Sequence, residues 1–377
     1  MDILKVPQGE FHLSRYPKRK KDLLRAWDAA DEYLLNYFYE EDIPQAELNI
    51  LIVNDSFGAL ATALANYNIT VWTDSWLSHE GVNQNYKQND LAIDAVKIIN
   101  SVDSPERGYD YILIKIPKSL AFLEDQLIRI KPFVSSTTRI IAAGMVKSIH
   151  TSTLKLFEKY IGSTKTSLAK KKARLIFCVP DENISVIKSP YPKSYVLEGT
   201  KYNVVNYANV FSRESLDIGT RFFLQHIPRS EKYKKIIDLG CGNGLVGLIA
   251  AEKNPHAEIL FIDESFMAVE SAKGTFVAAF EGHREAHFQV NDCLTGVKEE
   301  SADLILNNPP FHQDNAIGDE IAWRMFTQSR DVLKQDGELW VIGNRHLGYH
   351  LKLKKIFGNC ETVASNKKFI ILKSVKG

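Results

Sequence analysis

The sequence has few cysteines, and those it has lie far apart. Cys178, Cys241, Cys293 and Cys360 form no Cys-x-x-Cys pair, which argues against a zinc site and against a disulfide framework. The chain also lacks any run of about 18 apolar residues, and no apolar segment follows its basic N-terminal stretch. The sequence therefore predicts no metal site, no membrane span, no signal peptide and a cytoplasmic location.

An excess of charge of either sign is also absent. The formal net charge is +1 over 377 residues, so any nucleic acid would have to be bound through local basic patches. Hydrophobic residues make up 45% of the chain and charged residues 25%. That composition is ordinary for a globular protein, and at this length it predicts two domains.

The chain contains an internal repeat. Residues 50–65 (ILIVNDSFGALATALA) lie over residues 235–250 (KIIDLGCGNGLVGLIA), and each reads as a β-branched strand, a glycine-containing turn and an apolar helix. Residues 109–119 match residues 302–312, and later segments match in the same order. Strands alternating with helices predict an α/β fold with a mostly parallel, doubly wound sheet in each half.

The boundary between the halves is expected where periodicity stops. The stretch 183–202 is irregular and contains two prolines, so it is predicted to be a connector with room for a short hairpin. The predicted domains are then residues 1–182 and residues 203–377.

A glycine-rich turn follows the strand-like run KIID in the second half. The turn, residues 240–247, reads GCGNGLVG, and glycine there allows positive φ and close approach of the backbone to a ligand. A Gly-x-Gly turn alone is common to several kinds of nucleotide site, so neighbouring strands must distinguish them. The candidate cofactor residues of this element are Asp238, Gly240, Gly242 and Gly244.

The next two strand-like runs also end in polar residues. EILFID ends in Asp263, where an acid accepts hydrogen bonds from both ribose hydroxyls, and FQVND ends in Asn291 and Asp292, a pair suited to an adenine amino group. No Lys-Ser or Lys-Thr pair follows the glycines, as a triphosphate-binding loop requires. The pattern indicates adenosine without phosphates, hence S-adenosylmethionine, with an NAD-binding turn as the alternative.

The segment NPPF, residues 308–311, ends the fourth strand-like run. Its two prolines remove two backbone donors and fix φ twice, which gives the strand end one rigid shape. A planar amine is a poor nucleophile until acceptors hold its N–H bonds, and the side-chain oxygen of Asn308 and the carbonyl of Pro309 can be those acceptors. Phe311 would stack on the flat substrate and orient it. The alternative is a proline-terminated strand that simply enters a loop.

These motifs carry a family resemblance. The acid and glycine turn resemble the first motif of Rossmann-type methyltransferases, and NPPF resembles the catalytic motif of those that act on planar amines. With the segment FSRESLDIGT (211–220) and the duplication, the whole chain resembles the bacterial ribosomal RNA guanine-N2 methyltransferases. It is most similar to the large-subunit branch, the ribosomal RNA large subunit methyltransferase G family, which modifies guanine 1835 (ribosomal RNA numbering) of 23S rRNA.

The resemblance implies two class I methyltransferase domains, of which the N-terminal copy is degenerate. It also implies S-adenosylmethionine as cofactor, with Asn308 among the residues that bind it and Thr220 near its methionine end, and 23S rRNA as substrate. In the first half Lys115 stands where the second has Asn308, which replaces an acceptor by a donor. A monomer is expected, because the duplication already supplies two domains.

The first half carries two basic clusters that are candidates for RNA phosphate contacts. A run of charged residues is equally often a solvent-exposed face with no partner. The assignment therefore rests partly on the position of both clusters in the half that lacks the catalytic motif. The candidate RNA-binding residues are Lys18, Arg19, Lys20, Lys21, Lys170, Lys171 and Lys172.

Other functions share parts of this pattern. The sister branch methylates 16S rRNA, and Asn-Pro-Pro-aromatic motifs also occur in protein-glutamine and adenine-N6 methyltransferases. A non-catalytic RNA-binding factor in ribosome assembly is the alternative outside the enzymes. The complete set of Asp238, Asp263, Asp292 and Asn308 favours an active enzyme over that last alternative.

Overall fold

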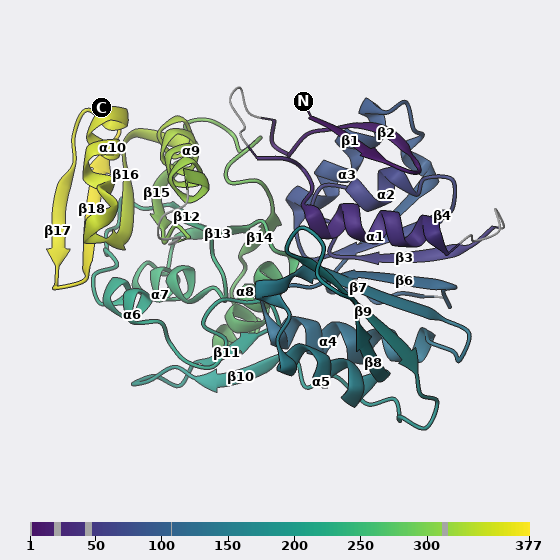
Figure 1. The fold of residues 1–377 in the computed structure, drawn as a ribbon. Coiled ribbons are helices and arrows are strands. Elements are labelled where there is room, and N and C mark those ends of the chain that lie inside the picture. Colours follow the sequence, from purple (N-terminus) through teal and green to yellow (C-terminus); the bar gives the residue numbers. More distant parts are fainter. Residues whose placement is uncertain (1, 19–23, 42–46, 107, 311–315) are drawn as a thin grey trace. The chain divides into compact units, whose positions relative to one another are not determined.

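A computed structural model describes residues 2–18, 24–41, 47–106, 108–310 and 316–377 of the protein. The chain divides into two compact units, Met1–Tyr191 and Pro192–Gly377 (Figure 1). The division lies inside the stretch 183–202 that the sequence predicts to be a connector. The second part of that stretch contains strand β10 (Lys193–Val196), which pairs with β11 (Asn203–Asn206) as a hairpin of the second unit.

The first unit is built around a seven-stranded sheet in the order β5-β4-β3-β6-β7-β9-β8. Its first five strands in that order are parallel, and β9 runs antiparallel to both β7 and β8. A separate hairpin of β1 and β2 precedes the sheet. The elements are β1 (Asp2–Val6), β2 (Gly9–Leu13), α1 (Ala29–Glu40), β3 (Asn49–Val53), α2 (Ala59–Ala63), β4 (Asn68–Thr73), α3 (Trp76–Gln88), β5 (Val96–Asn100), β6 (Tyr111–Lys115), α4 (Leu120–Ile130), β7 (Arg139–Met145), α5 (Thr151–Tyr160), β8 (Gly162–Thr166) and β9 (Ala173–Pro180).

The second unit repeats this plan element by element. Its sheet has the order β14-β13-β12-β15-β16-β18-β17, with the same parallel and antiparallel pairs in the same places. After the hairpin its elements are α6 (Ile218–Leu224), β12 (Lys235–Leu239), α7 (Leu245–Lys253), β13 (Glu258–Asp263), α8 (Phe266–Phe280), β14 (His287–Val290), β15 (Ala302–Asn307), α9 (Ala316–Val332), β16 (Leu333–Asn344), α10 (Tyr349–Phe357), β17 (Glu361–Ser365) and β18 (Phe369–Val375). The predicted fold class, a duplicated doubly wound α/β domain, is confirmed.

Helices cover both faces of each sheet, and alternate strand residues face opposite helix layers. On β12, Ile236 packs into the core beneath α6, α7 and α8, whereas Ile237 and Leu239 pack into the core beneath α9 and α10. In the first unit Ile52 faces α1, α2 and α3, and Leu51 faces α4 and α5. Both sheet faces are therefore buried, which explains the near-continuous apolar runs of the parallel strands.

The structure shifts the sequence overlay of the two halves by one residue at the first strand. Strands β3 and β12 start at Asn49 and Lys235, and the glycines that precede α2 and α7 are Gly58 and Gly244, both with φ of +80°. Residue 50 therefore corresponds to residue 236, and the overlay of 50–65 on 235–250 was one position out. The sequence did contain a signal for the correct register, because only this register places Gly58 over Gly244, whereas the overlay on 235–250 places it over Asn243.

Gly244 provides a test of how closely α7 and α8 approach each other. A Cβ at Gly244 would lie 2.8 Å from both Cα and Cβ of Ala272, whereas Gly282 has a similar φ of +75° and open space around it. Gly282→Ala should cost only backbone strain, about 1 kcal/mol, and Gly244→Ala about 1–3 kcal/mol more from overlap. Urea unfolding of the full chain measures both free energies, and equal losses in the two variants would contradict this packing.

Candidate active site

The polar residues predicted to bind the cofactor gather at one edge of the second sheet. Asp238, Asp263 and Asn291 lie at or just after the carboxyl ends of β12, β13 and β14, which are adjacent parallel strands. Asn308 follows β15, the other neighbour of β12. The carboxyl edge of a doubly wound sheet is where ligands bind in this architecture, so the topology brings these predicted residues together.

Asp238 is buried and ties the strand to the helix that follows it. Its Oδ2 atom accepts a hydrogen bond of 2.7 Å from the backbone N–H of Gly247 in the first turn of α7. Burial raises the pKa of Asp238 to about 7, opposed by that hydrogen bond and reinforced by the charge of Asp263. A methyl group at Gly247 would meet the ring of Phe261 at 2.2 Å, so this glycine is required by packing.

The glycine turn leaves open backbone above the sheet edge. Gly240 and Gly242 have φ of +74° and +54°, and a Cβ on Gly242 would meet nothing within 4 Å. Asp263 supports the turn from the next strand, because its Oδ2 accepts from the N–H of Gly242 at 3.0 Å and its Oδ1 from that of Ser265 at 3.1 Å. These residues fit a nucleoside ligand: there is space over the turn and a carboxylate beside it.

Asn291 and Asp292 are held more firmly than the sequence suggests. The carboxylate of Asp292 accepts hydrogen bonds from both terminal nitrogens of Arg324 on α9. The distance from Nη1 of Arg324 to Oδ2 of Asp292 is 2.8 Å. The amide of Asn291 donates to the carbonyl of Thr295 at 2.8 Å, and its oxygen accepts from the N–H of Asp292. A carboxylate oxygen accepts more than one hydrogen bond, so adenine contact by this pair stays a prediction. Arg324 was missed, because nothing in the sequence pairs it with a residue 32 positions away.

Asn308 stands between the glycine turn and α6. Its carbonyl lies 3.9 Å from the place that a Cβ on Gly240 would take. Its Nδ2 atom donates to the hydroxyl of Thr220 at 3.2 Å, whereas its Oδ1 is buried without a hydrogen-bond partner among the described residues. Pro309 is buried and Pro310 exposed. Phe311, predicted to stack on the substrate, lies outside the described residues.

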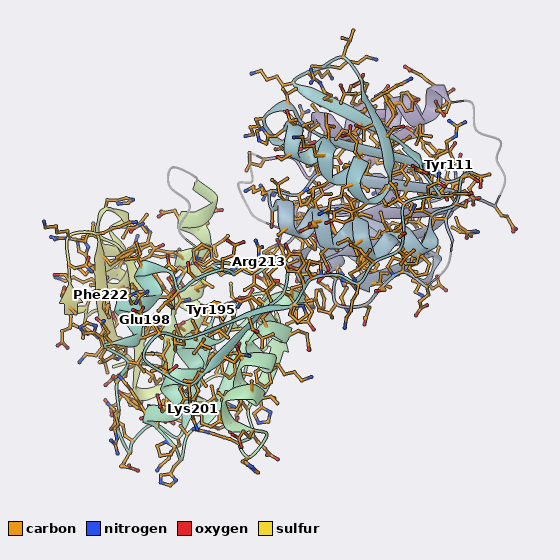
Figure 2. The ribbon with its side chains drawn as sticks, turned by 90° about the horizontal axis from the view of Figure 1, so that it is seen from below. Tyr111, Tyr195, Glu198, Lys201, Arg213 and Phe222 are labelled. Atoms are coloured by element: carbon orange, nitrogen blue, oxygen red, sulfur yellow. The ribbon has the colours of Figure 1, made fainter. Side chains whose placement is uncertain are left out.

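The segment before α6 positions Thr220. Asp217 caps the helix, and its Oδ2 accepts from the backbone N–H of Thr220 at 2.9 Å. Arg213, labelled in Figure 2, donates to the carbonyl of Ala208 at 2.7 Å and so folds the preceding loop. Phe211 is left 66% exposed. The hydroxyl of Thr220 donates to Oδ2 of Asp217 at 3.4 Å, which leaves it an acceptor for Nδ2 of Asn308 and so turns the Asn308 oxygen away from it.

The first unit has two ion pairs in place of this hydrogen bond, one to the buried Asp31 and one to the exposed Asp28. Helices α1 and α6 pack against equivalent strands, and Asp28 and Asp217 are their N-caps, so Asp31 corresponds to Thr220. The ammonium of Lys115 lies 2.9 Å from Oδ1 of Asp28 and 2.7 Å from Oδ1 of Asp31. Burial lowers the pKa of Lys115, but the charges of Asp31 and Asp28 outweigh it and raise the pKa overall.

In the first unit, two side chains bind the backbone that follows β5. Arg129 of α4 lies over the ring of Trp72 at 5.0 Å from its centroid and donates to the carbonyls of Ser101, Val102 and Asp103, which follow β5. The indole N–H of Trp72 donates to the carbonyl of Asp103. Side chains therefore bind the backbone at this edge of the first sheet, and the loss of the cofactor site in this half stays a prediction.

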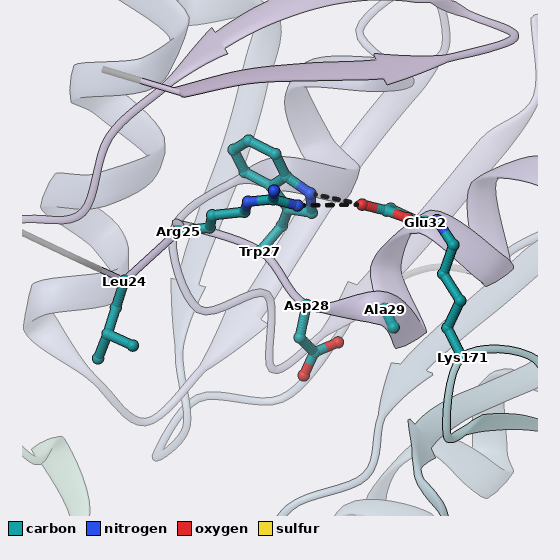
Figure 3. Close-up of a pocket in the computed structure, with 7 residues that line it drawn as sticks. All are labelled: Leu24, Arg25, Trp27, Asp28, Ala29, Glu32 and Lys171. Carbon is teal, nitrogen blue, oxygen red and sulfur yellow. Dashed lines mark hydrogen bonds and ion pairs between the residues drawn. The ribbon is translucent and has the colours of Figure 1, made fainter.

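The first unit has a cavity of about 370 Å³ beside the ion pairs of Lys115 (Figure 3). Glu32 accepts from the indole of Trp27 at 3.1 Å and from the ammonium of Lys171 at 2.8 Å, and Arg25 lies 3.8 Å from it. The charges that line the cavity are largely paired with one another. The lining residues are Leu24, Arg25, Trp27, Asp28, Ala29, Glu32 and Lys171.

The predicted basic clusters are partly visible. Lys18 and Lys172 are exposed, Lys170 lies over the ring of Tyr33, and Lys171 is paired with Glu32. Arg19, Lys20 and Lys21 lie outside the described residues. Phosphate binding by these lysines stays a prediction.

Two further searches cover only the described part of the chain. There, no group of three or more His, Cys, Asp or Glu side chains is arranged to hold a metal ion. In the same residues no helix is both long enough and apolar enough to cross a membrane.

Fold and site together define a Rossmann-type methyltransferase, and comparison with known proteins gives the family. The RLMG N-terminal domain matches residues 1–182, and the methyltransferase small domain matches residues 201–373. The chain is 48% identical to ribosomal RNA large subunit methyltransferase G of Streptomyces avermitilis, covering 100% of this chain and 99% of that protein. It is 45% identical to the protein of the same name from Stutzerimonas stutzeri, covering 100% of both.

The chain therefore belongs to the ribosomal RNA large subunit methyltransferase G family, and it is a methyltransferase. A solved structure with the same fold over the full length is the T. thermophilus 16S rRNA N2 G1207 methyltransferase in complex with AdoMet and guanosine. Its TM-score is 0.77 at 17% identity, covering 100% of this chain and 98% of that one. The predicted family, enzyme class and cofactor, S-adenosylmethionine, are confirmed by these comparisons.

The raised pKa of Asp238 predicts how stability depends on pH. Between about pH 4 and 7 the folded protein binds more protons at this group than the unfolded chain, so its stabilising contribution is lost as pH rises through about 7. Asp238→Asn keeps an acceptor and removes the titration. The melting temperature of the variant relative to wild type should therefore rise between about pH 5 and pH 8. A difference that is constant across that range would show that Asp238 does not titrate there.

Proposed function

We propose that the second unit transfers a methyl group to the exocyclic N2 amine of guanine 1835 in 23S rRNA. The observation that carries this proposal is the buried Oδ1 of Asn308, which has no partner among the described residues although its Nδ2 is anchored on Thr220. An acceptor left unpaired in the protein costs free energy that a substrate N–H can recover. The family membership supports rRNA as the substrate, and the T. thermophilus neighbour is named for guanine N2.

When bound, S-adenosylmethionine would supply an electrophilic methyl group and leave as S-adenosylhomocysteine. Asp263, Asn291 and Asp292 are proposed to hold its adenosine, and Gly240, Gly242 and Gly244 to let it approach the backbone. Asn308 and the carbonyl of Pro309 accept the two N–H bonds of the guanine amine, which orients its lone pair toward the methyl carbon. This is catalysis by orientation and by placed dipoles. No strong general base is needed, because the proton can leave after the transfer.

The first unit is proposed to hold and position the RNA. Its site lacks the acceptor that the chemistry needs, and Lys18 and Lys170–Lys172 offer positive charge. A guanine within a stem has to be flipped out to reach the second unit, so a loop or a loosened helix is the expected target. The enzyme is further proposed to act as a monomer in the cytoplasm.

Asn308→Ala tests the chemistry. It should lower methyl transfer by roughly 100- to 1000-fold and leave the affinity for S-adenosylmethionine within a few-fold, because Asn308 acts on the acceptor. Asn308→Asp, which keeps an acceptor oxygen, should retain more activity than the alanine variant. Transfer of labelled methyl to 23S rRNA and calorimetric cofactor binding measure the two quantities.

The target is tested in cells that lack the gene. Mass spectrometry of their 23S rRNA should show the loss of one N2-methylguanine, restored by the wild-type gene and poorly by Asn308→Ala. An unchanged 23S rRNA profile would sink the proposed target, and a change in 16S rRNA would move it to the small subunit.

A charge reversal tests the role of the first unit. Lys172 and Lys201 are both exposed lysines, the second in the hairpin turn of the catalytic unit (Figure 2). Lys172→Glu should weaken RNA binding several-fold. It should also reduce the slope of log affinity against log salt concentration by the amount expected for about one to two phosphate contacts. Lys201→Glu should change neither quantity. Equal effects of the two reversals, measured by filter binding over a range of salt, would leave the basic cluster without a specific role.

A further inference from the structure

Three buried carboxamide oxygens in the second unit accept no hydrogen bond from any described residue. They belong to Asn307, Asn308 and Asn344. Each residue stands at the carboxyl end of β15 or β16, the two strands that follow β12 in the sheet order. Buried polar atoms in native proteins are nearly always paired, so each exception needs an explanation, such as strain, a catalytic role or a bound water or ion. The carboxyl ends of β15 and β16 therefore carry unpaired acceptor oxygens on Asn307 and Asn344 in addition to the one on Asn308.

Asn308 and Asn344 point toward the same helix layer. Strand residues alternate between faces, and Leu306 and Ile342 both pack into the core beneath α6 and α7. Asn308 and Asn344 each lie two residues beyond these, on the same face of their strands. The hydrogen bond from Asn308 to Thr220 of α6 confirms that direction for the first of them.

The first turn of α6 links the two asparagines. Thr220 bonds to Asn308, and a Cβ on the adjacent Gly219 would lie 2.9 Å from the ring of Phe369. Phe369 is the residue directly opposite Asn344 in the pairing of β16 with β18. The register of β15 on β16 pairs Asn307 with Val341, so Asn308 and Asn344 are diagonal neighbours, with Cα atoms roughly 8 Å apart from strand spacing and rise. This spacing is one that the hydrogen-bonding edge of a single flat base can span.

We propose that Asn344 reads the identity of the base: its Oδ1 accepts a hydrogen bond from N1–H of the guanine whose N2 amine is held by Asn308. The inference rests on the proposed function. Guanine carries N1–H and the N2 amine side by side on one edge. Adenine carries an unprotonated N1 beside its amine, so a buried acceptor at this place meets a lone pair and rejects it. Asn344 is a specificity-determining residue and not a catalytic one.

The test uses a change in the base together with a change in the protein. A 23S rRNA fragment carries guanine, 2-aminopurine or hypoxanthine at the target position; 2-aminopurine keeps the amine and lacks the N1 proton, and hypoxanthine lacks the amine. The wild-type full chain should methylate guanine roughly 10- to 100-fold faster than 2-aminopurine. Asn344→Ala should lower the rate on guanine to near that on 2-aminopurine and leave the latter almost unchanged. Asn344→Asp, which keeps the acceptor, should retain the preference.

The outcomes separate the inference from the function on which it rests. If wild type does not methylate guanine, or methylates hypoxanthine equally well, the proposed N2 chemistry fails. If guanine is methylated but Asn344→Ala lowers both amine-bearing bases by the same factor, Asn344 has no part in reading N1 and the inference fails alone. Melting temperature and calorimetric affinity for S-adenosylmethionine accompany each variant. A cofactor affinity that falls by the same factor as the rate on guanine assigns Asn344 to the cofactor site and also overturns the inference.

Discussion

The hydrogen bond from the Asn308 amide to the Thr220 hydroxyl is the contact on which the proposed chemistry depends. It determines which atom of the carboxamide faces the acceptor pocket, and it does so from a helix that precedes the whole sheet in the sequence. Asp217 in turn fixes Thr220 by capping that helix. An asparagine free to turn over would present a donor as often as an acceptor, and the amine would then be repelled in half of the encounters.

The first unit has the same scaffold but different side chains at the position of Asn308 and Thr220. Its strand order matches that of the second unit, Gly58 precedes α2 with positive φ, and Asp28 caps α1. The hydroxyl has become the carboxylate of Asp31 and the amide has become the ammonium of Lys115, so a directional contact has been exchanged for an electrostatic one. At the corresponding sheet edge, Arg129 and Trp72 donate to the carbonyl of Asp103. The same scaffold therefore carries different side-chain contacts in its two copies.

The fold and the outline of the site could be predicted because their signals are local. Strand runs that end in Asp238, Asp263 and Asn308 report the sheet edge directly, and the repeated order of elements reports the duplication. What the sequence could not provide depends on contacts between distant positions. Arg324 reaches Asp292, and Lys115 reaches back 87 residues to Asp28. The unpaired oxygen of Asn344 is visible only once every nearby donor has been placed, since in the sequence it is one asparagine among many.

The buried charges around Lys115 also restrict how this chain can change. Restoring asparagine at position 115 by a single substitution would leave the buried carboxylate of Asp31 without its cation, and such unpaired buried charges cost about 3–5 kcal/mol. Replacing Asp31 alone would leave the Lys115 ammonium with only the partly exposed Asp28. Neither single substitution is therefore neutral for stability. The folding of the first unit thus maintains a charged pair where the second unit has the amide of Asn308 and the hydroxyl of Thr220.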